Sequence, residues 1–266
     1  MHATRCIPTF GFMNAAAATT VSMVSGLFTA SWGAYKDAPL EGFSHQSFWR
    51  SMAFSVGILG VLRTLALAPL GVFRLFFVVM GVERLAIEIY KPCFRREDQG
   101  KYLIPQDMSF LGLHVANRGV KLAVGMALVC ATLGLLSIGT VVASWQAHFA
   151  VAVGTGLFIC CGGAAKDAPF EGFQPNKFLR SALVLAATSP LVYRLGAMPL
   201  GLAIFLNGGI ERLLVESYKT YFTAKPPGKF RTDLVVTDHA FLRWRPVLRA
   251  IAGLIVLGIV IAYVAS

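Results

Sequence analysis

Residues 34–43 read AYKDAPLEGF and residues 164–173 read AAKDAPFEGF, so eight of the ten positions are identical at an offset of 130. Further along, residues 81–85 (GVERL) return as residues 209–213 (GIERL) at an offset of 128. A similarity that keeps nearly the same offset over this distance is typical of an internal duplication. The sequence therefore predicts a chain built from two copies of one unit, each carrying the same charged motifs.

Composition indicates that these two units lie in a bilayer. The chain is 56% hydrophobic and 14% charged, with a mean hydropathy of +0.66, whereas about a quarter of the residues in soluble domains are charged. Residues 6–35 and 122–165 contain no Asp, Glu, Lys or Arg, and about 20 apolar residues suffice to cross the hydrocarbon core as a helix. We therefore expect an all-α polytopic membrane protein.

Each copy has room for four membrane segments. We expect repeat A at residues 1–141 and repeat B at residues 142–266. An even number of crossings returns the chain to the side it left, so the two four-helix repeats should be parallel, with a pseudo-twofold axis along the membrane normal. The eight transmembrane helices are expected near residues 12–34, 51–68, 70–90, 119–141, 146–165, 181–198, 200–217 and 247–265.

The hairpins at residues 51–90 and 181–218 leave two interpretations open. Arg63, Arg74 and Arg194 interrupt their otherwise apolar sequence. The two arms of each hairpin either cross the bilayer fully, with the arginines reaching toward the far interface, or form a re-entrant pair. Both interpretations return the chain to the same side, so the rest of the topology is unaffected.

The distribution of basic residues predicts the orientation. If both KDAP loops and the loops at residues 84–121 and 212–249 share one side, that side holds 20 of the 24 Lys and Arg residues. Such asymmetry identifies the cytoplasmic side, so both termini are expected on the other face of a plasma or inner membrane. The net charge of +11 then suits anionic lipid headgroups as partners, and no nucleic-acid motif accompanies it.

The duplicated charges supply the candidate binding residues. Eight of the 13 acidic residues belong to the duplicated motifs, and bases recur beside them. A balanced cluster of this kind suits a structural ion-pair network, while acids beside a lysine can also hold a hard cation or a phosphate-bearing group. The candidate substrate-binding residues are Lys36, Asp37, Glu41, Arg50 and Glu83 in repeat A, and Lys166, Asp167, Glu171, Arg180 and Glu211 in repeat B.

Helix geometry separates two acids of the ERL motif. Glu88 lies four residues after Arg84 and three before Lys91, so these side chains share a face and can pair locally. Glu83 lies about 140° around the helix from Glu88 and needs a partner from another segment. The same holds for Glu211. Each acid is therefore either a functional group or half of a tertiary ion pair, with Arg50 or Arg180 as the expected base.

The KDAP loop also has two interpretations. Pro39 and the neighbouring acids suit the first turn of a helix, so the motif can start a short interfacial helix that ends at Gly42. Alternatively, Lys36, Asp37 and Glu41 contact a ligand at the membrane surface. The cysteines and histidines show no metal-ligand spacing, so no metal site is expected. No catalytic residue is assigned.

Three functions follow from this architecture. We rank a transporter or flippase first, because two fused parallel halves create a central axis where equivalent charged clusters can form one site. A membrane enzyme acting on a lipid-linked phosphate is the second. The cofactor is otherwise unknown, and Mg²⁺ is compatible with this interpretation alone. A non-catalytic membrane subunit or scaffold is the third.

Overall fold

The protein is all-α over the described residues of a computed structural model. That part of the chain covers residues 13–67, 70–96, 99–100, 102–110, 112–222, 236 and 238–265. It contains α1 (Ala15–Glu41), α2 (His45–Thr64), α3 (Val72–Cys93), α4 (Arg118–Leu136), α5 (Trp145–Glu171), α6 (Pro175–Arg194), α7 (Leu200–Ser217) and α8 (Arg245–Val264). A π-helical turn, Tyr218–Phe222, follows α7, and a 3-10 turn, Phe241–Trp244, precedes α8.

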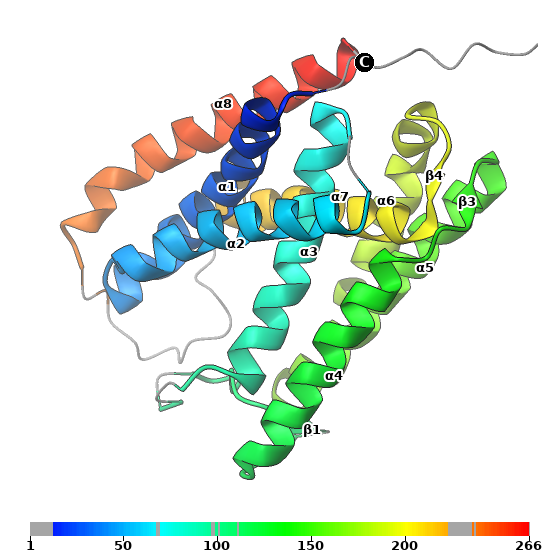
Figure 1. The fold of residues 1–266 in the computed structure, drawn as a ribbon. Helices are drawn as coiled ribbons and strands as arrows, with labels where there is room; N and C mark the ends of the chain where they lie inside the picture. The colour runs from blue at the N-terminus through cyan, green and yellow to red at the C-terminus, as the bar shows by residue number, and fades with distance from the viewer. Residues whose placement is uncertain are drawn as a thin grey trace, which may run out of the picture.

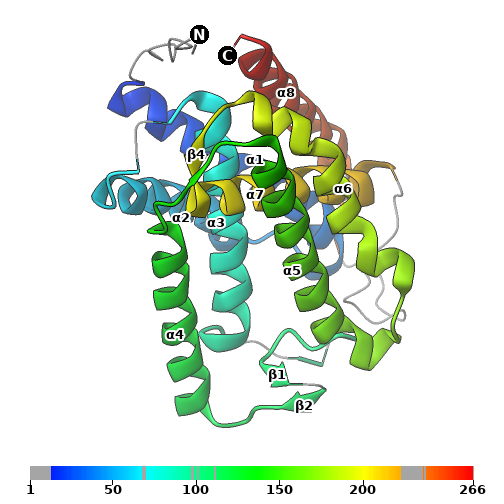
Figure 2. The same ribbon diagram turned by 90° about the vertical axis from the view of Figure 1, so that its right-hand side faces the viewer.

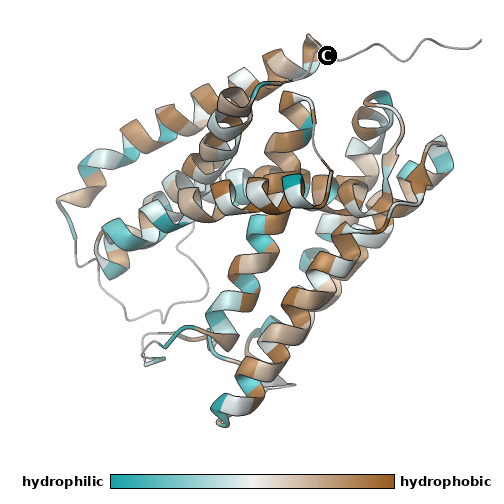
Figure 3. Cartoon of the chain, viewed as in Figure 1, coloured by the Kyte–Doolittle hydropathy of each residue, from teal (hydrophilic) through white to brown (hydrophobic). Residues whose placement is uncertain are grey.

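Three helices are long and apolar enough to span a membrane. They are α4, α5 and the helix over Phe241–Val264 that includes α8. In each of them less than a third of the most apolar 18 residues is buried inside the protein, so the apolar side chains face outward. Figure 3 shows this hydrophobic colouring along α4 and α8. The eight helices overlap the eight expected segments.

The centre of the fold is the crossing of α3 and α7. Figures 1 and 2 show these two helices crossing in the middle of the molecule, and the buried core includes Phe76, Met80 and Leu206 from them. A Cβ atom on Gly81 would strike the carbonyl oxygen of Phe205, and a Cβ atom on Gly209 would strike that of Phe77. The two backbones therefore touch at glycines, which supply no side chain to hold the helices apart.

Two helical hairpins flank this crossing. The α1–α2 hairpin closes where a Cβ atom on Gly26 would lie 2.6 Å from the Cα atom of Met52. The α5–α6 hairpin closes in the same way, with 2.5 Å from a Cβ atom on Gly156 to the Cα atom of Ala182. The fourth and eighth helices are placed differently, because α8 packs along α1 whereas α4 packs against α3 and α7.

Short strands join some of the loops. β3 (Val141–Val142) pairs antiparallel with β4 (Met198–Pro199), which connects the loop before α5 to the loop before α7. β1 (Ser109–Phe110) pairs with β2 (Leu113–His114) in the segment between α3 and α4. Each pair is a sheet of only two short strands, so the fold remains helical.

The KDAP motifs end long helices, so the expected helix start at Pro39 is wrong. Pro39 lies inside α1, and Gly42 ends this helix with a φ of +78°. Pro169 and Gly172 occupy the same places in α5. A proline removes the backbone donor to the carbonyl four residues earlier, and in α1 the carbonyl oxygen of Tyr35 instead accepts a hydrogen bond from Arg245 Nε at 3.3 Å.

Candidate functional site

Two buried ion pairs connect α3 to α7. Arg212 on α7 binds Glu83 on α3, and Arg84 on α3 binds Glu211 on α7. The Glu83 and Glu211 side chains are each 1% exposed. Arg212 also donates a hydrogen bond to the carbonyl oxygen of Met80 at 3.3 Å. The carboxylates are thus held by guanidinium groups at the helix crossing, where the low dielectric strengthens the attraction between opposite charges.

The expected partners of these acids were partly wrong. Glu83 does have its base on another segment, but that base is Arg212 and not Arg50 or Arg180. Arg84 was expected to pair with Glu88, but it binds Glu211. The guanidinium group of Arg50 lies over the ring of Tyr90, with 5.4 Å between its Cζ atom and the ring centroid.

A second pair of salt bridges joins the KDAP lysines to the ERL helices. Lys36 Nζ lies 3.4 Å from a carboxylate oxygen of Glu216, and Lys166 Nζ lies 3.4 Å from one of Glu88. Each glutamate also has a base three residues later in the chain. Lys91 Nζ lies 3.6 Å from Glu88, which is the local pairing expected from the sequence. The duplicated charges therefore form one network that connects the two hairpins to the central helices.

Lys177 gathers the acids of the second KDAP motif. Its Nζ atom lies 2.6 Å from Glu171 and 3.5 Å from Asp167. Although burial lowers the pKa of Lys177, the hydrogen bond to Glu171 and the charges of both acids raise it above its ordinary value. Sequence reasoning missed this residue because the matching position in the first copy is Ser47. The sequence signal that could have identified Lys177 was that the second copy has a basic residue at a position where the first copy has none.

The first KDAP motif has a different environment. Glu41 accepts a hydrogen bond from the Tyr102 hydroxyl at 3.1 Å. Asp37 is half-buried in the last turns of α1. No group of three or more His, Cys, Asp or Glu side chains that could hold a metal ion occurs within the described residues.

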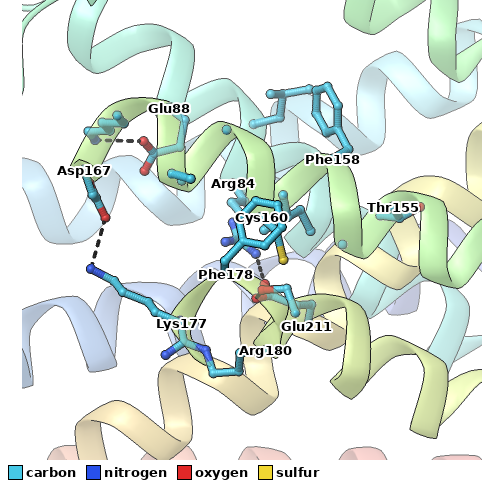
Figure 4. A pocket seen from close by; sticks show the side chains of 18 of the residues that line it. Arg84, Glu88, Thr155, Phe158, Cys160, Asp167, Lys177, Phe178, Arg180 and Glu211 are labelled. Atoms are coloured by element: carbon cyan, nitrogen blue, oxygen red, sulfur yellow. Dashed lines mark hydrogen bonds and ion pairs between the residues drawn. The ribbon is translucent and has the colours of Figure 1, made fainter. Parts of the chain in front are cut away.

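A cavity of about 850 Å³ opens beside the second copy of the motif, and we name it the α5–α7 cavity. Side chains of α3, α5, α6 and α7 form its walls (Figure 4). One part is apolar and includes Val151, Phe158, Ile159, Leu200, Ile204 and Phe205. The other part is charged and includes Arg84, Glu88, Lys166, Asp167, Lys177, Arg180, Glu211 and Lys219.

Four of the ten candidate site residues line this cavity. They are Lys166, Asp167, Arg180 and Glu211. The remaining candidates, Lys36, Asp37, Glu41, Arg50, Glu83 and Glu171, are not among its lining residues. The arrangement combines a large apolar surface with several charges at one end, which suits an amphipathic molecule.

Residue size differs between the two copies at the position of the cavity. Gly162 lines the cavity, whereas the matching residue of the first copy is Trp32. The Trp32 ring fills space between charges there, with its centroid 5.3 Å from Lys36 Nζ and 5.7 Å from Arg212 Cζ. Phe158 is 73% exposed, whereas its counterpart Phe28 is fully buried.

Comparison with known proteins gives no relative from which a site could be transferred. No protein-family description, curated protein or solved structure matches the chain.

Proposed function

We propose that this chain is a polytopic membrane transporter of the flippase type, whose lipid substrate enters the α5–α7 cavity. The observation that carries the proposal is the composition of the cavity wall. Apolar side chains such as Phe158 continue the outward face of α5, which is long and apolar enough to span a bilayer. Three of the charged lining residues, Lys166, Asp167 and Lys177, lie on either side of the α5–α6 turn. A headgroup and an acyl chain therefore find matching surfaces in one cavity.

The proposed architecture is two parallel repeats of four membrane segments, with boundaries at residues 1–141 and 142–266. Reciprocal contacts support it. The Glu83–Arg212 salt bridge corresponds to the Glu211–Arg84 salt bridge when the two copies are exchanged. In the same way, the Lys36–Glu216 salt bridge corresponds to the Lys166–Glu88 salt bridge. A twofold relation exchanges the members of each such set. We place its axis along the membrane normal, because each repeat has an even number of segments. We place the KDAP turns in the cytoplasm, as the distribution of Lys and Arg predicts.

The position of the cavity between the two proposed repeats supports a transport function. Parallel-repeat carriers place the substrate between their repeats and move the repeats against each other. Here the α5–α7 cavity includes Gly81 and Arg84 of α3 as well as residues of α5 to α7, so its wall contains both proposed repeats. A relative movement of α3 and α7 would change the shape of this cavity.

The enzyme and the scaffold interpretations have less support. Glu83, Glu88 and Glu211 are each bound by an arginine or a lysine, so a divalent cation would have to displace those bases. An ion-pair network alone suits a scaffold, but it does not account for a large cavity with an exposed phenylalanine. Lipid transport accounts for the network and the cavity together.

A lipid-movement assay tests the proposal. The purified protein is reconstituted into vesicles that contain phospholipids with a fluorescent acyl chain, and an impermeant reductant reports which leaflet holds the label. We expect faster exchange between leaflets than in protein-free vesicles. Gly162→Trp places in the cavity the side chain that the first copy carries, and the position has open space for a Cβ atom. This variant should lose most of the exchange.

Gly60→Trp on α2 is the matched control. Its Cβ atom also meets open space, and Gly60 does not line the cavity. Exchange should stay at the wild-type rate in this variant. Equal rates in vesicles with and without the wild-type protein, for every lipid tried, would overturn the proposed function.

A further inference from the structure

The charged end of the α5–α7 cavity holds more bases than acids. Five cationic side chains line it against three carboxylates. Three of the bases are held in salt bridges with the lining acids: Arg84 with Glu211, Lys166 with Glu88, and Lys177 with Asp167. Arg180 and Lys219 are the remaining two lining bases.

Arg180 has no ion-pair partner among the described residues. Its Nε atom is buried and donates no hydrogen bond to any of the described residues. In Figure 4 no dashed line ends on Arg180. A guanidinium group left in this state at a cavity wall is costly unless an acceptor binds it.

The matching arginine of the first copy, Arg50, also has a buried Nε atom without a hydrogen-bond partner among the described residues, but its guanidinium group has an aromatic contact. Arg50 lies over the ring of Tyr90, and this contact stabilises a cation by its attraction to the aromatic face. The counterpart of Tyr90 is Tyr218, which is 56% exposed. Within the described part of the chain, no aromatic ring lies under Arg180 as one does under Arg50. Arg50 therefore contacts an aromatic ring, whereas Arg180 lines the cavity.

Lys219 adds a second positive charge near Arg180. Burial lowers the pKa of Lys219, and the charges of Arg180 and Lys36 lower it further against the opposing effect of Glu216. Lys219 is held by Glu216 at 3.1 Å, but it also lines the cavity. Two cations that line one cavity favour the binding of an anion there.

We infer that the α5–α7 cavity selects a lipid with a phosphate headgroup, with the phosphate on Arg180 and Lys219 and the acyl chain against Phe158 and Ile159. Arginine binds phosphate through two parallel hydrogen bonds, and lysine binds it as a point charge. The exposed Phe158 ring provides an apolar surface for the chain. This inference rests on the proposed function, because it names the substrate class for the same cavity.

Equilibrium binding tests the inference without any transport step. Isothermal titration of the full-length protein in detergent uses four probes: dioctanoyl phosphatidic acid, dioctanoyl phosphatidylcholine, dioctanoylglycerol and glycerol 3-phosphate. We expect phosphatidic acid to bind about tenfold more tightly than dioctanoylglycerol and glycerol 3-phosphate. Phosphatidylcholine, whose phosphate carries a cationic choline group, should bind with an affinity between these. Equal affinity for phosphatidic acid and dioctanoylglycerol would overturn the headgroup assignment. Equal affinity for glycerol 3-phosphate would identify a soluble phosphate and overturn the lipid assignment.

Variants locate the binding site. Arg180→Gln should weaken the binding of phosphatidic acid about tenfold or more, and Arg180→Lys should weaken it less because it keeps the charge. Arg50→Gln is the matched control and should bind like the wild type. The melting temperatures of all three variants are measured first, and Arg180→Lys serves as the test if Arg180→Gln does not fold. Equal weakening by Arg50→Gln, or none by either Arg180 variant, would overturn the inference.

The two proposals fail in different ways. Selective binding of phosphatidic acid without lipid exchange would overturn the transport function and keep the substrate class. Lipid exchange without any preference for a phosphate headgroup would overturn the substrate class and keep the transport function.

Discussion

The Arg212 side chain is 8% exposed in its salt bridge with Glu83, whereas Arg84 is 27% exposed in its bridge with Glu211. Breaking a buried pair by removing one partner costs about 3–5 kcal/mol, because the remaining charge stays buried without compensation. Water screens a more exposed pair. The two equivalent bridges should therefore differ in their contribution to stability.

The first prediction compares the two arginines of this network. Arg212→Gln should lower the free energy of unfolding by about 3 kcal/mol or more, and Arg84→Gln should lower it by less. Denaturant unfolding in detergent, followed by intrinsic fluorescence, measures both. Restoring opposite charges by exchanging Glu83 and Arg212 should recover part of the loss. Equal destabilisation by the two single variants would show that burial does not govern the strength of these bridges.

The second prediction concerns the loop between α3 and α4. Lys121 Nζ lies 2.7 and 2.6 Å from the two carboxylate oxygens of Asp107. Burial alone would raise the pKa of Asp107, but the hydrogen bonds from Lys121 and from the Met108 amide, with the charge of Lys121, hold it below its ordinary value. The native state therefore favours the ionised carboxylate.

The sign of the pH dependence follows from this depressed pKa. The stabilisation is fully present above the unfolded pKa of about 3.9 and is lost as the pH falls through the lower folded value. Asp107→Asn should thus melt at a lower temperature than the wild type at pH 7. The difference should shrink as the pH falls below about 4. A difference that stays constant from pH 7 to pH 3 would contradict an ionic role for Asp107.

At the scale of elements, the crossing of α3 and α7 rests on glycine. The sequence contains no GxxxG spacing, so the contact was not predicted from a known motif. The usable signal was positional, because Gly81 and Gly209 recur at an offset of 128, and Gly26 and Gly156 recur at an offset of 130. A residue that recurs in both copies without any charge or side chain indicates a close backbone approach.

The third prediction tests this crossing. Gly81→Ala should be strongly destabilising, by about 3 kcal/mol or more, because the added methyl group strikes the Phe205 carbonyl and neither backbone can yield easily. Gly60→Ala on α2 is the control, since a Cβ atom there meets open space. That substitution should be neutral or stabilising, because alanine favours a helix by up to about 1 kcal/mol over glycine. Similar melting temperatures for both variants would contradict the role assigned to Gly81.

The end of α1 shows which local signals were sufficient and which were not. Gly42 was expected to end a helix, and it does, because its φ of +78° suits a residue without a side chain. Pro39 was expected to begin one, since proline is common in a first turn. Instead, Pro39 lies inside α1, and a long-range contact compensates for the hydrogen bond that the proline removes. The carbonyl that Pro39 leaves without its helical partner is bound by Arg245, more than 200 residues later in the sequence.

For the whole molecule, composition predicted the helical class and the positions of the helices, but not their packing. Charge spacing identified Glu83 as an acid that needs a distant partner, and Arg212 provides it. The identity of that partner depends on the α3–α7 crossing, which no local pattern encodes. The cavity was equally hidden, because it lies beside residues that differ between the copies, such as Gly162 in place of Trp32, and the sequence argument used the similarities between the copies.

The fourth prediction tests the proposed parallel topology of the whole chain. Ser44 and Gln174 occupy matched N-cap positions of α2 and α6, and both are exposed. Single cysteines are introduced at these positions after the native cysteines are replaced. In intact cells, an impermeant maleimide should leave both unlabelled, and permeabilisation should make both reactive, since the surrounding basic residues place them in the cytoplasm.

Thr140→Cys provides the reference for the opposite face. Thr140 is exposed in the connection between α4 and α5, which should lie outside if α4 leaves the cytoplasm and α5 returns to it. This cysteine should react in intact cells. Because a parallel duplication requires the two matched turns to share one side, labelling of only one of Ser44→Cys and Gln174→Cys from outside would instead indicate inverted repeats. The basic residues of the two KDAP regions would then lie on opposite faces, and the rule that gave the orientation would not describe this chain.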